Sequence, residues 1–151
     1  MSMHFNGRLN NCLGKVYACR HEIVDRFYEL LFEERPDVKD MFTGDFHKQK
    51  EMFSMMIAML ARATATGQGA AEMGNQIREQ HEGLDIEPEL FIRSGVLLRQ
   101  AFVDVLGDQI GDFEKVLLTE SIGRLTAAAA GRQPCLSAGS DAKNADGGTE
   151  G

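Results

Sequence analysis

The sequence contains little that would break helices or favour β strands. It has only 3 prolines and no tryptophan in 151 residues, and no segment alternates apolar and polar residues for long. Alanine, leucine, methionine, glutamate, glutamine, lysine and arginine, which all favour helix, are instead abundant. With 43% hydrophobic residues the chain can also bury a core. These properties predict a single all-α domain.

Basic clusters and long apolar runs are also missing. The formal charge is -7, and no group of lysines or arginines is available to neutralise phosphates or anionic lipid head groups. The longest apolar-leaning run, residues 52–61, is too short to cross a bilayer, and no basic region followed by an apolar one opens the sequence. We therefore expect a cytoplasmic protein that binds neither nucleic acid nor membrane.

Cysteine is scarce, and its spacing argues against disulfides and covalent cofactors. Cys12 and Cys19 would lie about 10 Å apart along a helix, whereas Cα atoms joined by a disulfide are at most about 7 Å apart. Cys135 leaves an odd number. No CxxCH or CxxC pattern occurs, which excludes haem attachment of the cytochrome c kind and offers no zinc motif. We expect reduced thiols, with Cys12 and Cys19 packing on one helix face.

Apolar positions recur at helical spacing along most of the chain. Pro36 is expected to end one helix, Pro88 to begin another, and Asp45 to cap a third. Residues 64–74 are the most loop-like interior stretch. The predicted helices cover residues 7–19, 21–34, one or two turns within 36–42, 46–64, a short segment ending near 81, 88–106 and 112–130. One domain is expected over residues 1–131, and residues 132–151 are expected to be disordered because their composition cannot bury enough apolar area.

Four histidines are candidates for chemistry. His4 and His21 lie at expected helix starts, and His47 lies about 200° around a helix from Gln49, so those two side chains cannot face the same pocket. His81 has Ile77 one turn earlier as an apolar neighbour. A histidine at a helix end is nevertheless more often a surface residue, so local context does not single out His81.

The order of the features is more specific than any one of them. A helix is followed by a second helix that ends in a proline, a short turn that ends in Phe42, a helix with Gln49, a loop, His81 and two long helices. The segments concerned are FYELLFEERPDVKDMF at 27–42, QKEMFSMM at 49–56, REQHEGLDIEPELF at 78–91, LL at 97–98 and VLGD at 105–108. In these segments the chain resembles the bacterial single-domain globins and the globin domains of flavohaemoglobins, over about residues 5–108. That resemblance implies a three-over-three helical globin fold whose D helix is absent or very short.

The resemblance also implies a haem b site. His81 corresponds to the proximal histidine, which binds the haem iron and leaves the sixth position open. Tyr28 and Gln49 correspond to the distal tyrosine and glutamine. Both can donate hydrogen bonds to dioxygen, which takes on partial negative charge in such a pocket, and carbon monoxide gains less. Apolar walls for the porphyrin are expected from Phe42, Met52, Phe53, Met56, Ile77, Leu84, Ile86, Phe91 and Leu98.

Two differences from the globins that the chain resembles bear on the expected function. Phe91 stands where many relatives have a tyrosine, and no glutamate after Glu120 matches the one that acts with it on the proximal histidine. A weaker electron push on the iron favours binding of O2, NO or CO, for storage, scavenging or sensing, over catalysis. Two alternatives stay open: nitric oxide dioxygenation with a separate reductase, and a globin-like regulatory module without haem. A signalling partner and a homodimer through residues 88–106 and the last helix are further expectations.

Overall fold

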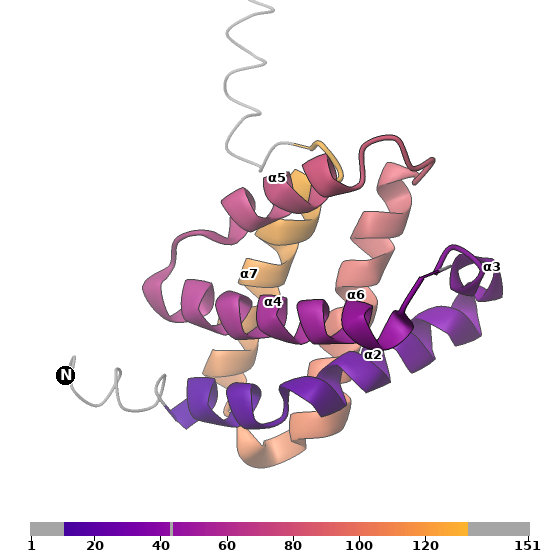
Figure 1. Cartoon of the computed structure of the whole chain (residues 1–151). Helices are drawn as coiled ribbons and strands as arrows, with labels where there is room; N and C mark the ends of the chain where they lie inside the picture. Colours follow the sequence, from indigo (N-terminus) through magenta and orange to yellow (C-terminus); the bar gives the residue numbers. More distant parts are fainter. Residues whose placement is uncertain (1–10, 43, 133–151) are drawn as a thin grey trace, which may run out of the picture.

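The computed structural model describes residues 11–42 and 44–132, and they form helices joined by short connections (Figure 1). Residues 11–18 are helical. The further helices are α2 (Arg20–Glu34), α3 (Pro36–Lys39), α4 (Phe46–Thr66), α5 (Ala70–Gln80), α6 (Pro88–Leu106), the 3-10 helix η1 (Gly107–Gln109) and α7 (Asp112–Ala129). The described ranges contain no strand. None of their helices combines the length and the apolar character needed to cross a membrane.

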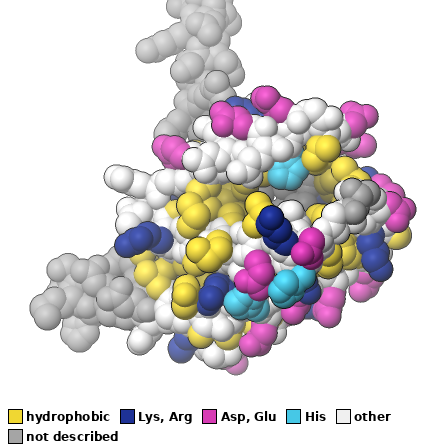
Figure 2. All heavy atoms as spheres, in the orientation of Figure 1, with side chains coloured by type: hydrophobic (Ala, Val, Ile, Leu, Met, Phe, Trp, Pro, Cys, Tyr) yellow, Lys and Arg dark blue, Asp and Glu magenta, His cyan; other side chains and the backbone are white. Residues whose placement is uncertain are grey.

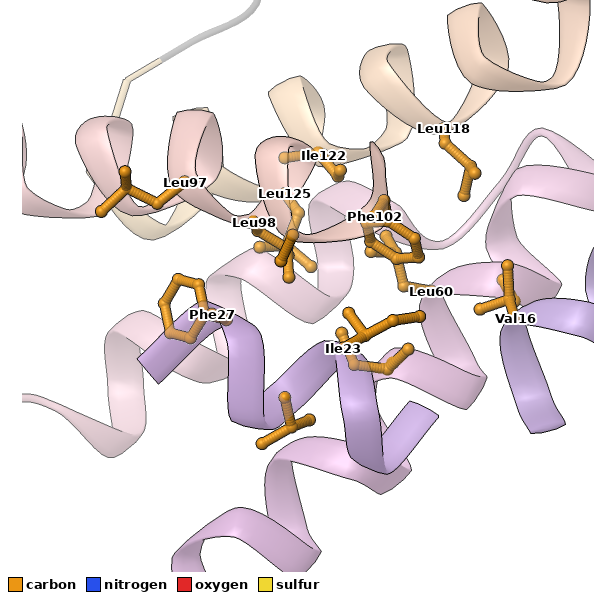
Figure 3. Close-up of a cluster of buried hydrophobic side chains, with 14 of the residues drawn as sticks. Val16, Ile23, Phe27, Leu60, Leu97, Leu98, Phe102, Leu118, Ile122 and Leu125 are labelled. Carbon is orange, nitrogen blue, oxygen red and sulfur yellow. The ribbon is translucent and has the colours of Figure 1, made fainter. Parts of the chain in front are cut away.

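The core lies where residues 11–18, α2, α4, α6 and α7 meet. Each helix contributes apolar residues three or four positions apart, so that they share one face and point inward. Figure 3 shows this convergence of side chains from separate helices. Its members include Val16, Ile23, Leu60, Leu98, Phe102, Leu118 and Ile122, each at most 3% exposed. The core therefore joins helices that are distant in sequence, such as α2 and α6.

The two helices expected to face each other across the haem are held by different neighbours. The helix α4 packs on α2 and α7, whereas α5 packs almost wholly on α7. Contacts between α4 and α5 are few, and the two helices diverge in Figure 1. This arrangement leaves the facing sides of α4 and α5 largely unpaired by helix packing.

Gly74 explains why α5 lies so close to α7. A Cβ atom at this position would lie 2.1 Å from the carbonyl oxygen of Leu125 and 2.7 Å from the Cβ of Ala128. Only glycine permits this approach, although glycine in a helix interior costs about 0.5 to 1 kcal/mol relative to alanine. Close packing therefore fixes the helix that leads into His81.

Most predicted helix boundaries agree with the structure, and those around one loop do not. Pro36 and Pro88 begin α3 and α6, and Asp45 caps α4 by accepting a hydrogen bond from the Lys48 N–H at 3.3 Å. The loop predicted over 64–74 is wrong: the helices continue on both sides, and only residues 67–69 are non-helical. The predicted boundary between the first two helices is confirmed to within one residue: within the described residues the first helix covers 11–18, and a turn at Cys19 precedes α2.

The remaining predictions about organisation have different outcomes. Residues 40–42, 44 and 45 are not helical, in agreement with a missing D helix. The cysteines Cys12 and Cys19 are free, with Cys12 buried. The disordered segment predicted over 132–151 falls, apart from Arg132, outside the described residues. The helices and their packing confirm the expected all-α, globin-like fold.

Candidate functional site

A cluster of aromatic rings surrounds Tyr28 on the inner face of α2. The tyrosine is only 5% exposed. Five phenylalanine rings have centroids between 5.0 and 5.6 Å from its own: Phe27, Phe32, Phe42, Phe46 and Phe53. Four of these five contacts are edge-to-face, the geometry that aromatic quadrupoles favour. The phenol group is thus held in a dry, apolar cage built from α2, the segment after α3, and α4.

The pKa of the Tyr28 hydroxyl is set by its burial and by the nearby Gln49. Burial raises its pKa to about 12 because the phenolate would lose its hydration, and a hydrogen bond with Gln49 lowers the pKa in part. Gln49 is half-buried in the first turn of α4. The residue pair predicted to line the distal side is therefore joined, and Tyr28 is a protonated donor across the physiological range.

A pocket opens beside Gln49, at the corner between α3 and α4. Its volume is about 300 Å³, at the lower end for small-molecule sites. The lining residues are Met41, Phe42, Gly44, Asp45, Phe46, Lys48, Gln49 and Met52. Phe42, Gln49 and Met52 were predicted to face a haem, and the structure brings these three together around one opening. Figure 2 shows the surface hollowed between α5 and the start of α4.

His81 directly follows α5, so a different helix from those of the aromatic cage positions it. Its Nδ1 is 2.7 Å from the carbonyl oxygen of Ile77, one turn earlier. Because a carbonyl can only accept, Nδ1 carries the hydrogen, so in the neutral imidazole Nε2 holds the lone pair. A metal-binding histidine is typically oriented by such a bond to its second nitrogen. The half-buried ring of His81 is thus in the tautomer that a metal requires.

Phe91 restrains the orientation of the His81 ring by packing against it. The two ring centroids are 5.6 Å apart and the planes are nearly perpendicular, at 88°. Phe91 belongs to the first turn of α6, which Pro88 begins. An edge-on phenylalanine restrains the imidazole but donates no hydrogen bond to it. His81, Ile77 and Phe91 therefore form a second group that shares no member with the aromatic cage.

The other predicted wall residues differ in exposure. Leu98 is 3% exposed and belongs to the core, whereas Met52 and Leu84 are 55% and 56% exposed. Phe53, Met56 and Ile86 are half-buried. Phe53 contacts Phe27, with ring centroids 4.9 Å apart. A flat apolar group between α4 and α5 would cover the exposed members of this set.

Sequence reasoning missed three members of the aromatic cage. Phe27 and Phe32 lie on α2 beside Tyr28 and one turn after it, and Phe46 lies one turn before Gln49. The helical spacing from Tyr28 and Gln49 could have identified Phe32 and Phe46, but each also fits an ordinary core position. Their packing around one hydroxyl becomes visible only when α2 and α4 are placed against each other.

Haem iron needs few protein donors, unlike a metal ion held by side chains alone. No group of three or more histidine, cysteine, aspartate or glutamate side chains suited to a metal ion occurs in residues 11–42 and 44–132. His81 offers a single nitrogen with a free lone pair, and the distal pair offers polar hydrogens in an apolar cage. One protein ligand with an open opposite side fits the requirements of haem iron.

The fold is thus all-α and globin-like. The chain is similar to the flavohemoprotein of Bacillus subtilis (strain 168), with 29% identity over 92 residues, or 57% of this chain. The match covers 22% of that protein, so the chain spans well under half of its length. No family model matches the chain. No solved structure matches it either. This similarity supports a globin-like relationship.

Proposed function

We propose that this chain binds haem b through Nε2 of His81 and reversibly binds O2, and also NO and CO, on the side of Tyr28 and Gln49. The observation that carries the proposal is the 2.7 Å bond between Nδ1 of His81 and the Ile77 carbonyl, which leaves Nε2 as the free acceptor. The similarity to a flavohemoprotein, whose name describes a haem protein, supports the same reading. When bound, haem supplies an iron with one open coordination position.

The residues of the chain would select among ligands. The hydroxyl of Tyr28 is protonated and the amide of Gln49 carries two hydrogens, so both can donate to a diatomic molecule that gains negative charge. The surrounding phenylalanines exclude water, and hydrogen bonds in such a dry pocket are stronger than in water. O2 would therefore be held more firmly than the less polar CO.

Titration of the purified full-length chain with hemin tests the proposal. We expect one haem per chain and a Soret band that His81→Gly shifts and weakens. Added imidazole should restore the wild-type spectrum in His81→Gly, since it can occupy the vacated position without any change in fold. The matched control is His47→Ala, an exposed histidine on α4 that should leave the spectrum unchanged. Absence of haem uptake by the wild type would contradict the proposal and favour a haem-free regulatory module.

Nitric oxide dioxygenation with a separate reductase is a second candidate, favoured by the hydrogen bond between Tyr28 and Gln49. The edge-on Phe91 weighs against it, because it supplies no hydroxyl to the proximal side. Mixing the oxygenated protein with NO in a stopped-flow instrument separates the two functions. Slow formation of the ferric protein would identify a binder, and rapid formation would identify the dioxygenase.

A further inference from the structure

The outer face of α4 carries an unusual exposed stripe. Lys48, Met52, Met55, Met59 and Arg62 follow one another at steps of four, three, four and three residues. At 100° per residue they fall within an arc of about 80° and extend for about 21 Å along the helix. The buried residues of α4, among them Ile57 and Ala61, lie on the opposite side. We call these five residues the methionine stripe.

Both kinds of residue in the stripe are exposed. Met52, Met55 and Met59 are 55%, 60% and 52% exposed, although methionine is usually buried. No ion pair within the described part of the chain involves Lys48 or Arg62. By contrast, two other charged residues of α4 pair with α2: Glu51, which lies beside the stripe, with His21, and Lys50, which lies on the far side of the helix, with Asp25. Figure 2 shows hydrophobic side chains along α4 with basic side chains toward either end.

The charge of α4 sets it apart from the rest of the molecule. It contains Lys48, Lys50 and Arg62 against the single carboxylate Glu51, whereas the whole chain has a formal charge of -7. We infer that the methionine stripe docks an acidic amphipathic helix of another protein, with apolar side chains between carboxylates at either end. Steps of four and three are the pattern with which two helices pack side by side. Flexible methionines suit such a contact because they adapt to the shape of the partner.

Charge argues against the other occupants of this face. In an antiparallel pair of two copies, Lys48 would meet Arg62 of the second copy, and in a parallel pair each cation would meet its own counterpart, so both arrangements repel. Residues 1–10 contain no carboxylate side chain, and residues 133–151 contain only Leu136 as a large apolar residue. An anionic membrane would be repelled by the net charge of the chain.

Binding of designed peptides to the full-length chain tests the inference by fluorescence anisotropy. One helical peptide carries three leucines at steps of four and three, with glutamates at both ends, and its matched control carries lysines in place of the glutamates. We expect the acidic peptide to bind at least tenfold more tightly than the basic one. Met55→Gln/Met59→Gln and Lys48→Glu/Arg62→Glu should each weaken binding at least tenfold. Val96→Gln/Val116→Gln, at residues 50% and 53% exposed on α6 and α7, should not.

Circular dichroism shows whether each variant keeps its helices, so that a loss of binding can be assigned to the stripe. Equal binding of the two peptides, or binding that survives Met55→Gln/Met59→Gln, overturns the inference. Self-association in sedimentation experiments that Met55→Gln/Met59→Gln abolishes would assign the face to a second copy and overturn it too. Binding to phosphatidylcholine and phosphatidylglycerol vesicles that Lys48→Glu/Arg62→Glu abolishes would assign it to a membrane. None of these readouts requires haem. Lys48 and Met52 also line the pocket beside Gln49, whereas Met55 and Met59 do not, so Met55→Gln/Met59→Gln is the variant whose outcome is independent of the proposed function.

Discussion

At the scale of single residues, the hydroxyl of Tyr28 is a polar group surrounded by aromatic rings. Five phenylalanine rings hold the tyrosine in place through its ring, and Gln49 contacts its oxygen. The position of the side chain and its hydrogen-bonding function therefore depend on different atoms. Substitution of tyrosine by phenylalanine separates the two.

We predict that Tyr28→Phe accelerates O2 dissociation from the haem-loaded protein by about tenfold or more. A hydrogen bond to a charged partner contributes about 1.5 to 3 kcal/mol, and 1.4 kcal/mol corresponds to a factor of ten. Dissociation of CO should change much less. Laser photolysis and stopped-flow replacement of O2 by CO measure both rates. Equal effects on the two gases would argue that Tyr28 acts through packing and not through its hydroxyl.

The raised pKa of Tyr28 also predicts how stability depends on pH. The unfolded tyrosine loses its proton at a pKa of 10, whereas the folded one keeps it to about 12. The unfolded state thus binds fewer protons in this window, and the free energy of unfolding falls as the pH rises from 10 to 12. Two pH units correspond to about 2.7 kcal/mol at most.

Urea unfolding at pH 9, 10 and 11 checks this prediction by comparing the wild type with Tyr28→Phe. The variant should lose less stability as the pH rises. Tyr17→Phe is the matched control, because Tyr17 is 54% exposed and should reproduce the wild-type dependence. Parallel curves for all three proteins would show that the hydroxyl of Tyr28 is not desolvated.

The residues of the site could be predicted from sequence only as a set. The identities of Tyr28, Gln49 and His81 became meaningful through their order along the chain, and the structure joins the first two. The Ile77 carbonyl that orients His81 is a backbone atom, so no side-chain pattern indicates it. The exposure of Met52 and Leu84 also depends on the separation between α4 and α5, which sequence patterns do not specify.

At the scale of the helices, α5 is positioned by its contact with α7. Gly74 allows this contact, and Arg78 donates a hydrogen bond to the Ala128 carbonyl at 3.4 Å. His81 is the C-cap of α5, one turn after Ile77, so its position is set by the way α5 packs on α7. A change in this helix contact should therefore alter the position of His81.

We predict that Gly74→Ala destabilises the protein by several kcal/mol and weakens haem binding. The added Cβ would overlap the backbone of α7, which cannot rotate away as a side chain would. Gly123→Ala is the control: this glycine lies on α7 with nothing within 4 Å of the added Cβ, and alanine should stabilise the helix by about 0.4 to 1 kcal/mol. Urea unfolding and hemin titration of both variants provide the comparison. Similar stability of the two variants would mean that α5 has room to move away from α7.

Helix boundaries were predictable where a residue fixes the backbone by itself. Pro36 and Pro88 do so, because proline fits the first turn of a helix and not its interior. The stretch 64–74 was predicted wrongly because glycine and other small residues usually indicate a loop. Gly74 instead serves a close helix contact, a long-range effect that outweighs local helix propensity.

At the scale of the whole molecule, two parts of the site depend on different halves of the core. Tyr28 and Gln49 are carried by α2 and α4, whereas His81 is carried by α5 on α7. Since α4 and α5 contact each other little, a ligand bridging them would add contacts that helix packing does not supply. Such a ligand binds the native state and raises the free energy of unfolding by mass action.

We therefore predict that hemin raises the melting temperature of the full chain, with an added stability of about 2.7 kcal/mol at a free concentration 100 times the dissociation constant. Hydrogen exchange should show slower exchange in α4, in α5 and in the connection 81–87, and smaller changes in α7, none of whose residues is expected to line the haem. In His81→Gly, hemin should slow exchange less in α5 than in α4, because the variant lacks the proposed iron ligand that follows α5. Uniform protection of all helices, or none in α5, would indicate that hemin does not bridge α4 and α5.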